Sequence, residues 1–158
     1  MEKQQNYNIR EFSLSDLEAV RKVIIDTIEA CYPVAYCREA VDFFKEHHRV
    51  ENLLKSVKKD YIIVLEMDGR IVGTGTLERD EITRVFVLPE YQGLGLGKMI
   101  MQTLEEKARS QGIKAVNIDA SLVSLDFYHH LGYETTSVMY IPVENDQRLD
   151  YEEMKKVL

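Results

Sequence analysis

The first quarter of the chain changes from a strand-like to a helix-like pattern of apolar residues. Residues 8–12 alternate apolar and polar positions, as in a half-buried strand. Apolar residues then recur at steps of three and four, the spacing of an amphipathic helix: Leu17, Val20, Ile24 and Ile28. Ser15 and Glu18 have the spacing of a capping box at the start of this helix. After a loop around Pro33, we expect one or two further helices within residues 38–58.

The middle of the chain predicts three consecutive strands. Residues 61–67 are rich in β-branched and other apolar side chains, and Asp68-Gly69 directly after them is a strong signal for a hairpin turn. Residues 70–78 and 81–88 continue the strand-like pattern, with a short polar link between them. Together these segments predict an antiparallel meander.

After Pro89 the spacing becomes helical again. A glycine-rich run at residues 92–98 leads into a helix with an apolar stripe formed by Ile100, Met101, Leu104 and Ala108. Gln111-Gly112 supplies the stop signal of this helix. The order of elements predicts a mixed α/β fold in a single domain over residues 1–158. The remaining elements are expected at residues 115–120 (strand), 121–131 (short helix ended by Gly132), 133–143 (strand), 145–146 (turn) and 149–156 (a strand that closes the sheet).

Composition and charge narrow the classes of function. The chain has 158 residues, of which 45% are hydrophobic, and a formal net charge of -7. An acidic surface repels the phosphate backbone, so nucleic acid is not expected as a partner. No apolar run approaches the roughly 20 residues that a membrane-spanning helix needs. Because no apolar leader follows Met1, we expect a cytoplasmic protein that does not act at a membrane.

The cysteines and histidines do not have the spacing of a metal site. Cys31 and Cys37 stand alone, without a CxxC motif. The histidines form two adjacent pairs, at 47–48 and 129–130, and neighbouring side chains on a helix point about 100° apart. We therefore expect no metal.

The glycine-rich run is the feature of the sequence that most clearly indicates a ligand. A strand that ends in such a loop and opens a helix offers unpaired N–H groups and the positive helix end to a phosphate. The spacing does not fit a P-loop, because only three residues separate Gly93 from Gly97 and Met99 follows Lys98. It does not fit the GxGxxG dinucleotide fingerprint either. Alternating glycines without a ligand would only weaken the helix.

Two motifs resemble those of the GCN5-related N-acetyltransferases. Gln92-x-x-Gly95-x-Gly97 matches the family's Q/R-x-x-G-x-G/A motif, and the strand at 82–87 stands where the family has its pantetheine-binding strand. A second run resembles the family's N-x-x-A-x-x-F-Y-x-x-x-G-F: Ser121-x-x-Ser124-x-x-Phe127-Tyr128-x-x-x-Gly132-Tyr133. The expected element order is similar to the family's over nearly the whole chain. The implied fold is a central, mostly antiparallel sheet, splayed at the acetyl-CoA site and flanked by helices.

The resemblance implies an acetyl-CoA site. The main chain of Val85, Phe86 and Val87 would pair with the pantetheine arm like an added strand. Ser121 and Ser124 stand where many members have Asn and Ala; a side-chain bond from Ser121 to the pantetheine stays open. Main-chain N–H groups of the loop would hold the pyrophosphate: Gln92, Gly93, Leu94, Gly95, Leu96, Gly97 and Lys98.

The resemblance also suggests residues for the chemistry. Acyl transfer to an amine needs a proton acceptor for the amine and a proton donor for the leaving thiolate. Tyr128 is the candidate acid, unless its ring only packs under the sheet. Glu81 is the candidate base, with an ordinary exposed charge as the alternative, and water could carry the proton instead. A backbone N–H near Val87 would stabilise the oxyanion.

The acceptor is less defined by the sequence. Residues 25–44 stand where the family forms much of its acceptor pocket, and five of them could contact a cationic amine: Glu29, Tyr32, Tyr36, Glu39 and Asp42. Cys31 lies near the same side, most simply as a small buried residue. We expect a primary amine of a small molecule or peptide, attacked directly in a ternary complex. Edge strands near the C-terminus would allow a homodimer.

Two other functions remain open at this stage. The chain could be a CoA-binding sensor or inactive relative that keeps the phosphate loop without turnover. It could also be an interaction module whose scaffold has lost the cofactor. Turnover of amines would distinguish an enzyme from a CoA-binding sensor or inactive relative. Binding of CoA would distinguish an enzyme from an interaction module.

Overall fold

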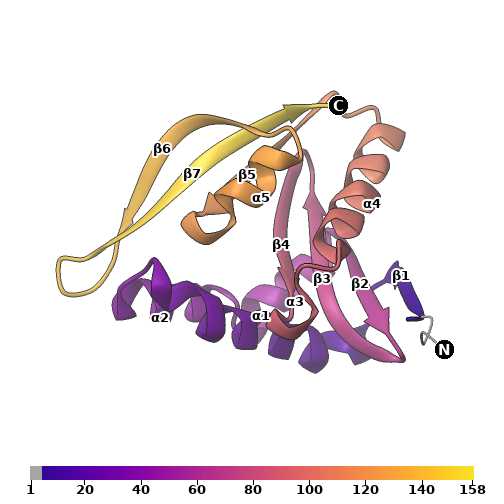
Figure 1. Cartoon of the computed structure of the whole chain (residues 1–158), viewed down its shortest axis with the longest axis horizontal. Helices are drawn as coiled ribbons and strands as arrows, with labels where there is room; N and C mark the ends of the chain where they lie inside the picture. The colour runs from indigo at the N-terminus through magenta and orange to yellow at the C-terminus, as the bar shows by residue number, and fades with distance from the viewer. Residues whose placement is uncertain (1–4) are drawn as a thin grey trace.

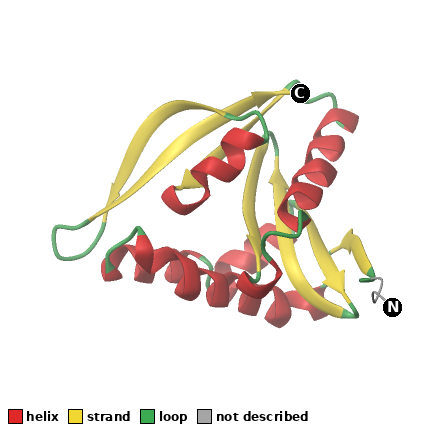
Figure 2. Ribbon diagram, viewed as in Figure 1, coloured by secondary structure: helices red, strands yellow, loops and turns green. Residues whose placement is uncertain are grey.

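Seven strands form one sheet in the order β1-β2-β3-β4-β5-β7-β6, with helices on both faces (Figure 1, Figure 2). The computed structural model describes residues 5–158. The strands are β1 Tyr7–Glu11, β2 Tyr61–Met67, β3 Arg70–Glu78, β4 Glu81–Val87, β5 Ala115–Ser121, β6 Glu134–Pro142 and β7 Arg148–Val157. The helices are α1 Leu17–Cys31, α2 Arg38–His47, α3 Val50–Val57, α4 Leu96–Ser110 and α5 Leu125–His130, with short 3-10 turns between some of them.

The sheet is antiparallel except at its centre. β1 to β4 pair as an antiparallel series, and β5, β7 and β6 form a second one. β4 and β5 run parallel and share a single register pair, Glu81 with Asn117. Asn117 N also donates to Asp80 O at 2.9 Å. Beyond this point the two strands separate, so the expected mixed fold with a mostly antiparallel, splayed sheet is confirmed.

Helices α1 and α4 cover opposite faces of β3 because side chains alternate along a strand. Thr74 faces a small apolar gap lined by Val20 and Ile24 of α1. Its neighbour Gly75 faces α4, and a Cβ built there would lie 2.6 Å from Ile100 Cγ2. The absence of a side chain at this position therefore lets α4 pack close to the sheet. The predicted stripe of α4 forms the contact and is fully buried: Ile100, Met101, Leu104 and Ala108.

From the sequence we expected the last strand to close the sheet. The structure places it inside the sheet instead of at the edge. β7 pairs with β6 on one side and with β5 on the other, so β6 is the edge strand. The turn at Asn145 and Asp146, both at positive φ, folds β7 back along β6. The free side of β7 then pairs with β5 from Ala115 to Ser121, which satisfies the backbone groups of β5 on the side away from β4.

Smaller differences from the expected elements concern helix boundaries. The capping box is formed by Ser13 and Asp16 at a 3-10 turn before α1, not by Ser15 and Glu18. The region 38–58 forms two helices, and the expected helix at 121–131 begins with a 3-10 turn at Leu122–Ser124. Local hydrogen bonding of short polar side chains decides such boundaries, and several sites of similar composition compete for it.

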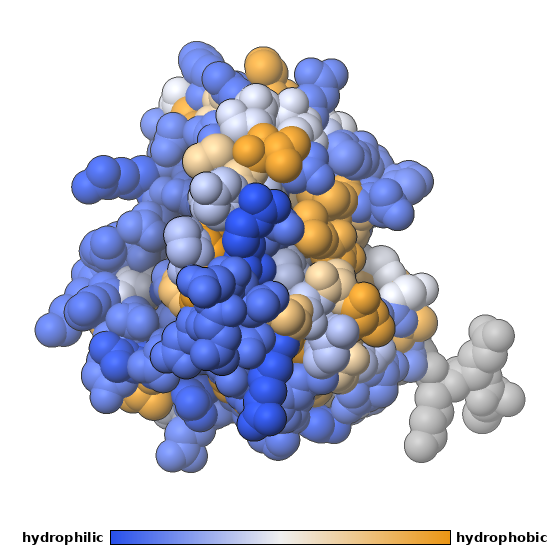
Figure 3. Space-filling view, turned by 90° about the vertical axis from the view of Figure 1, so that its left-hand side faces the viewer, coloured by the Kyte–Doolittle hydropathy of each residue, from blue (hydrophilic) through white to orange (hydrophobic). Residues whose placement is uncertain are grey.

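Polar contacts hold the C-terminal hairpin against the rest of the molecule. Tyr133 Oη donates to Glu105 Oε1 at 2.9 Å, and Lys156 Nζ lies 3.0 Å from the same oxygen. Tyr36 Oη donates to Asp150 O at 2.7 Å and accepts from Leu122 N at 2.8 Å. The hairpin and α2 meet at the end of the molecule seen in Figure 3, where hydrophilic side chains predominate over smaller hydrophobic areas. Within the described range 5–158, no helix is both long and apolar enough to cross a membrane.

Candidate active site

Two cavities meet where β4 and β5 separate. One, of about 400 Å³, extends toward the glycine loop and the start of α4. The other, of about 450 Å³, extends toward α2 and β7. Five residues line both cavities: Tyr32, Val85, Phe86, Ser121 and Ser124. The splayed strands therefore connect the two cavities. We call them the loop cavity and the helix-side cavity.

The loop cavity brings together nearly all the residues predicted for the cofactor. Eleven of the twelve line it: Val85, Phe86, Val87, Gln92, Gly93, Gly95, Leu96, Gly97, Lys98, Ser121 and Ser124. Leu94 is the exception, since its side chain is 51% exposed and does not line the cavity. Cys31 lines this cavity too, so it borders the predicted cofactor rather than the predicted acceptor.

The conformation of the loop explains two of its glycines. Gly93 and Gly95 have φ of 78° and 80°, which residues with a Cβ rarely adopt. A Cβ at either position would meet no atom within 4 Å, so the space beside the backbone is open. Gly95 is the N-cap of α4, and the free N–H groups of the first turn follow it. Open space, free donors and a helix start fit an anionic phosphate group.

Side chains fix the loop to the end of β4. Gln92 Nε2 donates to Val87 O at 2.9 Å and lies 3.9 Å from Cys31 Sγ. Thr27 Oγ1 of α1 is 3.4 Å from the same carbonyl oxygen. The hydroxyl groups of Ser121 and Ser124 form a hydrogen bond of 2.8 Å. The Ser121 hydroxyl is therefore already engaged in one hydrogen bond.

A β-bulge reshapes β4 where the two cavities join. Thr74 is opposite Phe86 and Thr76 is opposite Thr83, so two residues of β4 face one residue of β3. The first of these two, Arg84, has φ of 51°, a strained conformation for a residue that is neither Gly, Asn nor Asp. Bulges turn a strand and re-aim its backbone groups. No glycine marks this bulge in the sequence, so the strand pattern alone does not predict it.

Tyr128 lies in the helix-side cavity, and its hydroxyl group has no hydrogen-bond partner within residues 5–158. The residue is 6% exposed and packs edge-on against Phe127 and Tyr133. Burial raises the pKa of Tyr128 well above its ordinary value, with a smaller contribution from Tyr32. The phenol therefore remains protonated across the physiological range.

Glu81 lies in the same cavity with two other carboxylates, Glu78 and Asp119. Burial, followed by the charges of Asp119 and Glu78, raises the pKa of Glu81 to about 7. Burial also raises the pKa of Asp119, and Glu153 adds to this effect. A carboxylate with a pKa near neutrality can exchange a proton at physiological pH.

Several lining residues were not found from the sequence. Asp119 is one of them, since its carboxylate belongs to the cavity. His48, Arg84 and Tyr151 line it as well. Strand alternation would have placed Asp119 on the same face as Asn117 and Ser121. Only the splay of β4 and β5 turns that face into a cavity wall.

The residues expected from α1 and α2 are only partly in place. Tyr32 lines both cavities, but the hydroxyl of Tyr36 is engaged with the backbone of the C-terminal hairpin. Three acidic candidates do not line the helix-side cavity: Glu29 pairs with Lys45, Glu39 accepts from Asn145, and Asp42 lies near Arg38. Helix faces were ambiguous in the sequence, because exposed and cavity-facing positions are both polar.

No group of three or more His, Cys, Asp or Glu side chains within residues 5–158 is placed to hold a metal ion. His47 and His48 are in contact edge-on, with ring centroids 5.1 Å apart.

Comparison with known proteins gives a family and several relatives. Residues 34–157 match the family model described as the acetyltransferase (GNAT) domain. A stretch of 69 residues is 42% identical to an acetyltransferase of Bacillus subtilis strain 168, over 43% of this chain and 44% of that protein. Another, of 76 residues, is 41% identical to the glucosamine 6-phosphate N-acetyltransferase of Trypanosoma brucei brucei, over 41% of this chain and 52% of that one. The chain thus spans about half the length of these curated relatives.

Solved structures share the fold at low sequence identity. A GCN5-related N-acetyltransferase from Rhodopseudomonas palustris superposes with a TM-score of 0.89 over 100% of both chains, at 20% identity. PaiA N-acetyltransferase from Thermoplasma acidophilum, solved in complex with coenzyme A, has a TM-score of 0.73 over 97% of this chain and 99% of that one, at 19% identity.

Proposed function

This chain belongs to the GNAT acetyltransferase family, and from that premise we propose that it transfers an acetyl group from acetyl-CoA to a primary amine of a small molecule or peptide. The observation that carries the proposal is the junction of two cavities at the splay of β4 and β5. Amine and thioester can meet there at the same time, which suits direct attack in a ternary complex. We further propose that residues 1–158 act as one domain.

The loop cavity fits acetyl-CoA by its shape and by its donors. The main chain of residues 92–98 would hold the pyrophosphate at the open side of Gly93 and Gly95. The backbone of residues 85–87 would pair with the pantetheine arm, because β4 has no strand partner there on its β5 side within the described residues. When bound, acetyl-CoA supplies the activated acyl group. Ser121, already bonded to Ser124, would contribute a hydroxyl beside it.

Glu81 would receive the proton of the amine. An ammonium with an ordinary pKa of about 10.4 must lose a proton before it can attack. The pKa of Glu81, raised to about 7, is closer to the pKa of the amine than that of an ordinary carboxyl group. Above neutral pH the Glu81 carboxylate is still largely ionised and can accept a proton. The transfer can run directly or through water.

Tyr128 would return a proton on the leaving side. Its buried phenol stays protonated and its hydroxyl is not engaged by another described residue. A backbone N–H at the end of β4, near Val87, would stabilise the oxyanion, as hydrogen-bond donors do in acyl transfer.

The test begins with ligand binding and proceeds to turnover. We expect acetyl-CoA, but neither NAD nor ATP, to stabilise the protein by about 2.7 kcal/mol at a hundredfold excess over Kd. Release of free CoA with a panel of primary amines then measures acetyl transfer. Binding without turnover of any amine would indicate a CoA sensor or inactive relative. Failure to bind any CoA species would favour an interaction module and contradict the proposal.

A further inference from the structure

Three carboxylates lie together on one face of the sheet, and two of them, Glu81 and Asp119, line the helix-side cavity. Glu81 on β4 is level with Asn117 on β5, and Asp119 lies two residues further along the same face. Asp119 is paired in register with Glu153 of β7. None of Glu81, Asp119 and Glu153 takes part in an ion pair within residues 5–158. This wall of the cavity therefore carries negative charge that no ion pair within residues 5–158 neutralises.

Three cations lie near these carboxylates: Arg84, which lines the cavity and whose Nε has no partner within residues 5–158, Lys59, and Lys155 of β7, which is paired in register with Asn117. Arg84 Nη1 donates to Ser56 Oγ at 3.1 Å, and the charges of Glu78 and Asp60 act on the same guanidinium. Lys59 Nζ lies 3.0 Å from Glu78 Oε1. Glu78 is thus balanced, whereas Glu81 and Asp119 are not. The cavity as a whole keeps an excess of negative charge.

His48 adds a hydrogen-bond acceptor to the same cavity. Its Nδ1 lies 2.7 Å from Phe44 O, and because a carbonyl oxygen only accepts, Nδ1 carries the proton. Burial lowers the pKa of His48 to about 3, so the ring is neutral and Nε2 presents a lone pair. The residue is 5% exposed, lines the cavity, and has no partner for Nε2 within the described chain. A group with N–H donors fits this nitrogen.

Aromatic rings complete the environment of a cation. Tyr151 lines the cavity and is paired in register with Ser121 at the junction. Tyr151 is two residues from Glu153 on β7, so it lies on the same face of the sheet as Glu153 and Asp119. Ammonium groups bind well between carboxylates and aromatic faces.

Building on the proposed function, we propose that the amine acceptor carries a second cationic group. Asp119 holds this group beside Tyr151, and His48 Nε2 accepts a further N–H bond from the acceptor. Glu81 receives the proton of the reacting amine. Asp119 lies about 6.6 Å along the sheet from the level of Glu81 and one strand spacing of about 4.8 Å across, so the two backbone positions are about 8 Å apart. Their side chains can converge on the two charges of a short diamine across this distance. An acceptor with an anionic group in place of the second cation would meet uncompensated carboxylates.

The experiment compares three probes of similar length with the intact chain and acetyl-CoA at pH 8.5: 1,4-diaminobutane, n-butylamine and 4-aminobutanoate. We expect kcat/KM to be about tenfold or more higher for the diamine than for butylamine, and lowest for 4-aminobutanoate. Asp119→Asn should lower the ratio of diamine to butylamine about two- to fivefold, the upper part of the range for an exposed ion pair. Asp68→Asn, which removes the same charge from the distant β2–β3 turn, should leave the ratio unchanged.

Failure of this inference differs from failure of the proposed function. The proposal of a second cationic group is wrong if butylamine is used equally well, if 4-aminobutanoate is preferred, or if Asp119→Asn leaves the ratio unchanged. Acetyl transfer itself would still stand. If none of the three probes is acetylated, the acetyl-CoA-saturated protein is melted with each of them. A rise in Tm with the diamine alone then supports the inference, and its absence overturns it. A protein that acetyl-CoA itself does not stabilise contradicts the proposed function.

Discussion

Glu81 and Asn117 form the one register pair between β4 and β5 within residues 5–158. The pair marks the point where the sheet opens, and the candidate base stands at that point. Everything proposed for the site depends on this opening, because the two cavities meet beyond it.

Activity should depend on the ionisation of Glu81. Burial and neighbouring carboxylates disfavour its charged form and so raise its pKa to about 7. Because only the carboxylate accepts a proton, kcat/KM should rise with pH through about 7 and then level off. Glu81→Gln should remove this limb and lower kcat/KM by about 100-fold or more. The exposed Glu134→Gln on β6 is the control, and an unchanged pH profile in Glu81→Gln would exclude its role as the base.

Tyr128→Phe should separate catalysis from folding. The hydroxyl has no hydrogen-bond partner within the described chain, so its removal should change the free energy of unfolding by less than about 1 kcal/mol. The loss of a proton donor should lower kcat by about 100-fold. Steady-state kinetics and urea unfolding measure the two effects, with the acetyl-CoA-dependent shift in Tm as a check of binding. Full turnover in this variant would show that Tyr128 is not the general acid.

Gly95→Ala should weaken both the fold and the binding of acetyl-CoA. The φ of 80° costs a residue with a Cβ about 1–2 kcal/mol, although no neighbouring atom lies within 4 Å. Gly112→Ala is a matched control, since Gly112 has φ of 78°, equally open surroundings and a place at the far end of α4. Both variants should lose similar stability by urea unfolding. Only Gly95→Ala should raise the Kd of acetyl-CoA, and an equal change in both would contradict the proposed phosphate site.

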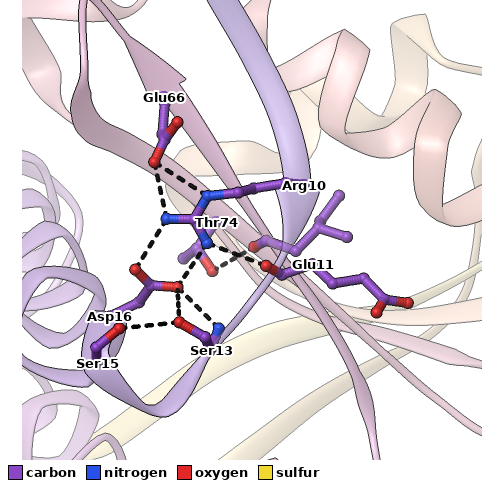
Figure 4. Close-up of polar contacts among 8 residues, drawn as sticks. Arg10, Glu11, Ser13, Ser15, Asp16, Glu66 and Thr74 are labelled. Carbon is purple, nitrogen blue, oxygen red and sulfur yellow. Dashed lines mark hydrogen bonds and ion pairs between the residues drawn. The ribbon is translucent and has the colours of Figure 1, made fainter.

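Asp16 should contribute stability that is lost in acid. Arg10 donates to Asp16 Oδ2 at 2.8 Å and to Glu66 Oε1 at 2.7 Å, as Figure 4 shows, and Asp16 also accepts from Ser13 N. These contacts, led by the bond from Arg10, lower the pKa of Asp16 from 3.8 to about 2. A lowered carboxyl pKa means that the contribution is full above pH 3.8 and disappears as pH falls through about 2.

Asp16→Asn tests this network. Loss of a hydrogen-bonded charge with a buried side chain should cost about 2–3 kcal/mol at pH 7, measured by urea unfolding. The difference from the wild type should shrink between pH 4 and pH 2. Asp26→Asn breaks the exposed ion pair with Lys22 on α1 and should cost less than about 0.5 kcal/mol. A pH-independent cost in Asp16→Asn would show that its charge is not involved.

Local sequence patterns were sufficient to predict the helices and strands and part of the candidate site. The hairpin at Asp68 and Gly69, the stripe of α4 and the loop at 92–98 depend on turn chemistry and apolar periodicity, which act within a few residues. The loop motif also located the residues that line the loop cavity, and Glu81 and Tyr128 were both found in the other one.

Other features depend on contacts between distant segments. The insertion of β7 beside β5, the bulge at Arg84 and the separation of β4 from β5 follow from how backbone groups find partners across the sheet. Asp119 and His48 lie in one cavity only because these long-range pairings are made. The sequence by itself determined which segments are strands and helices and which loop carries the glycines of the proposed phosphate site. Only the tertiary structure decided which charges face each other, because that depends on pairings between residues far apart in the chain.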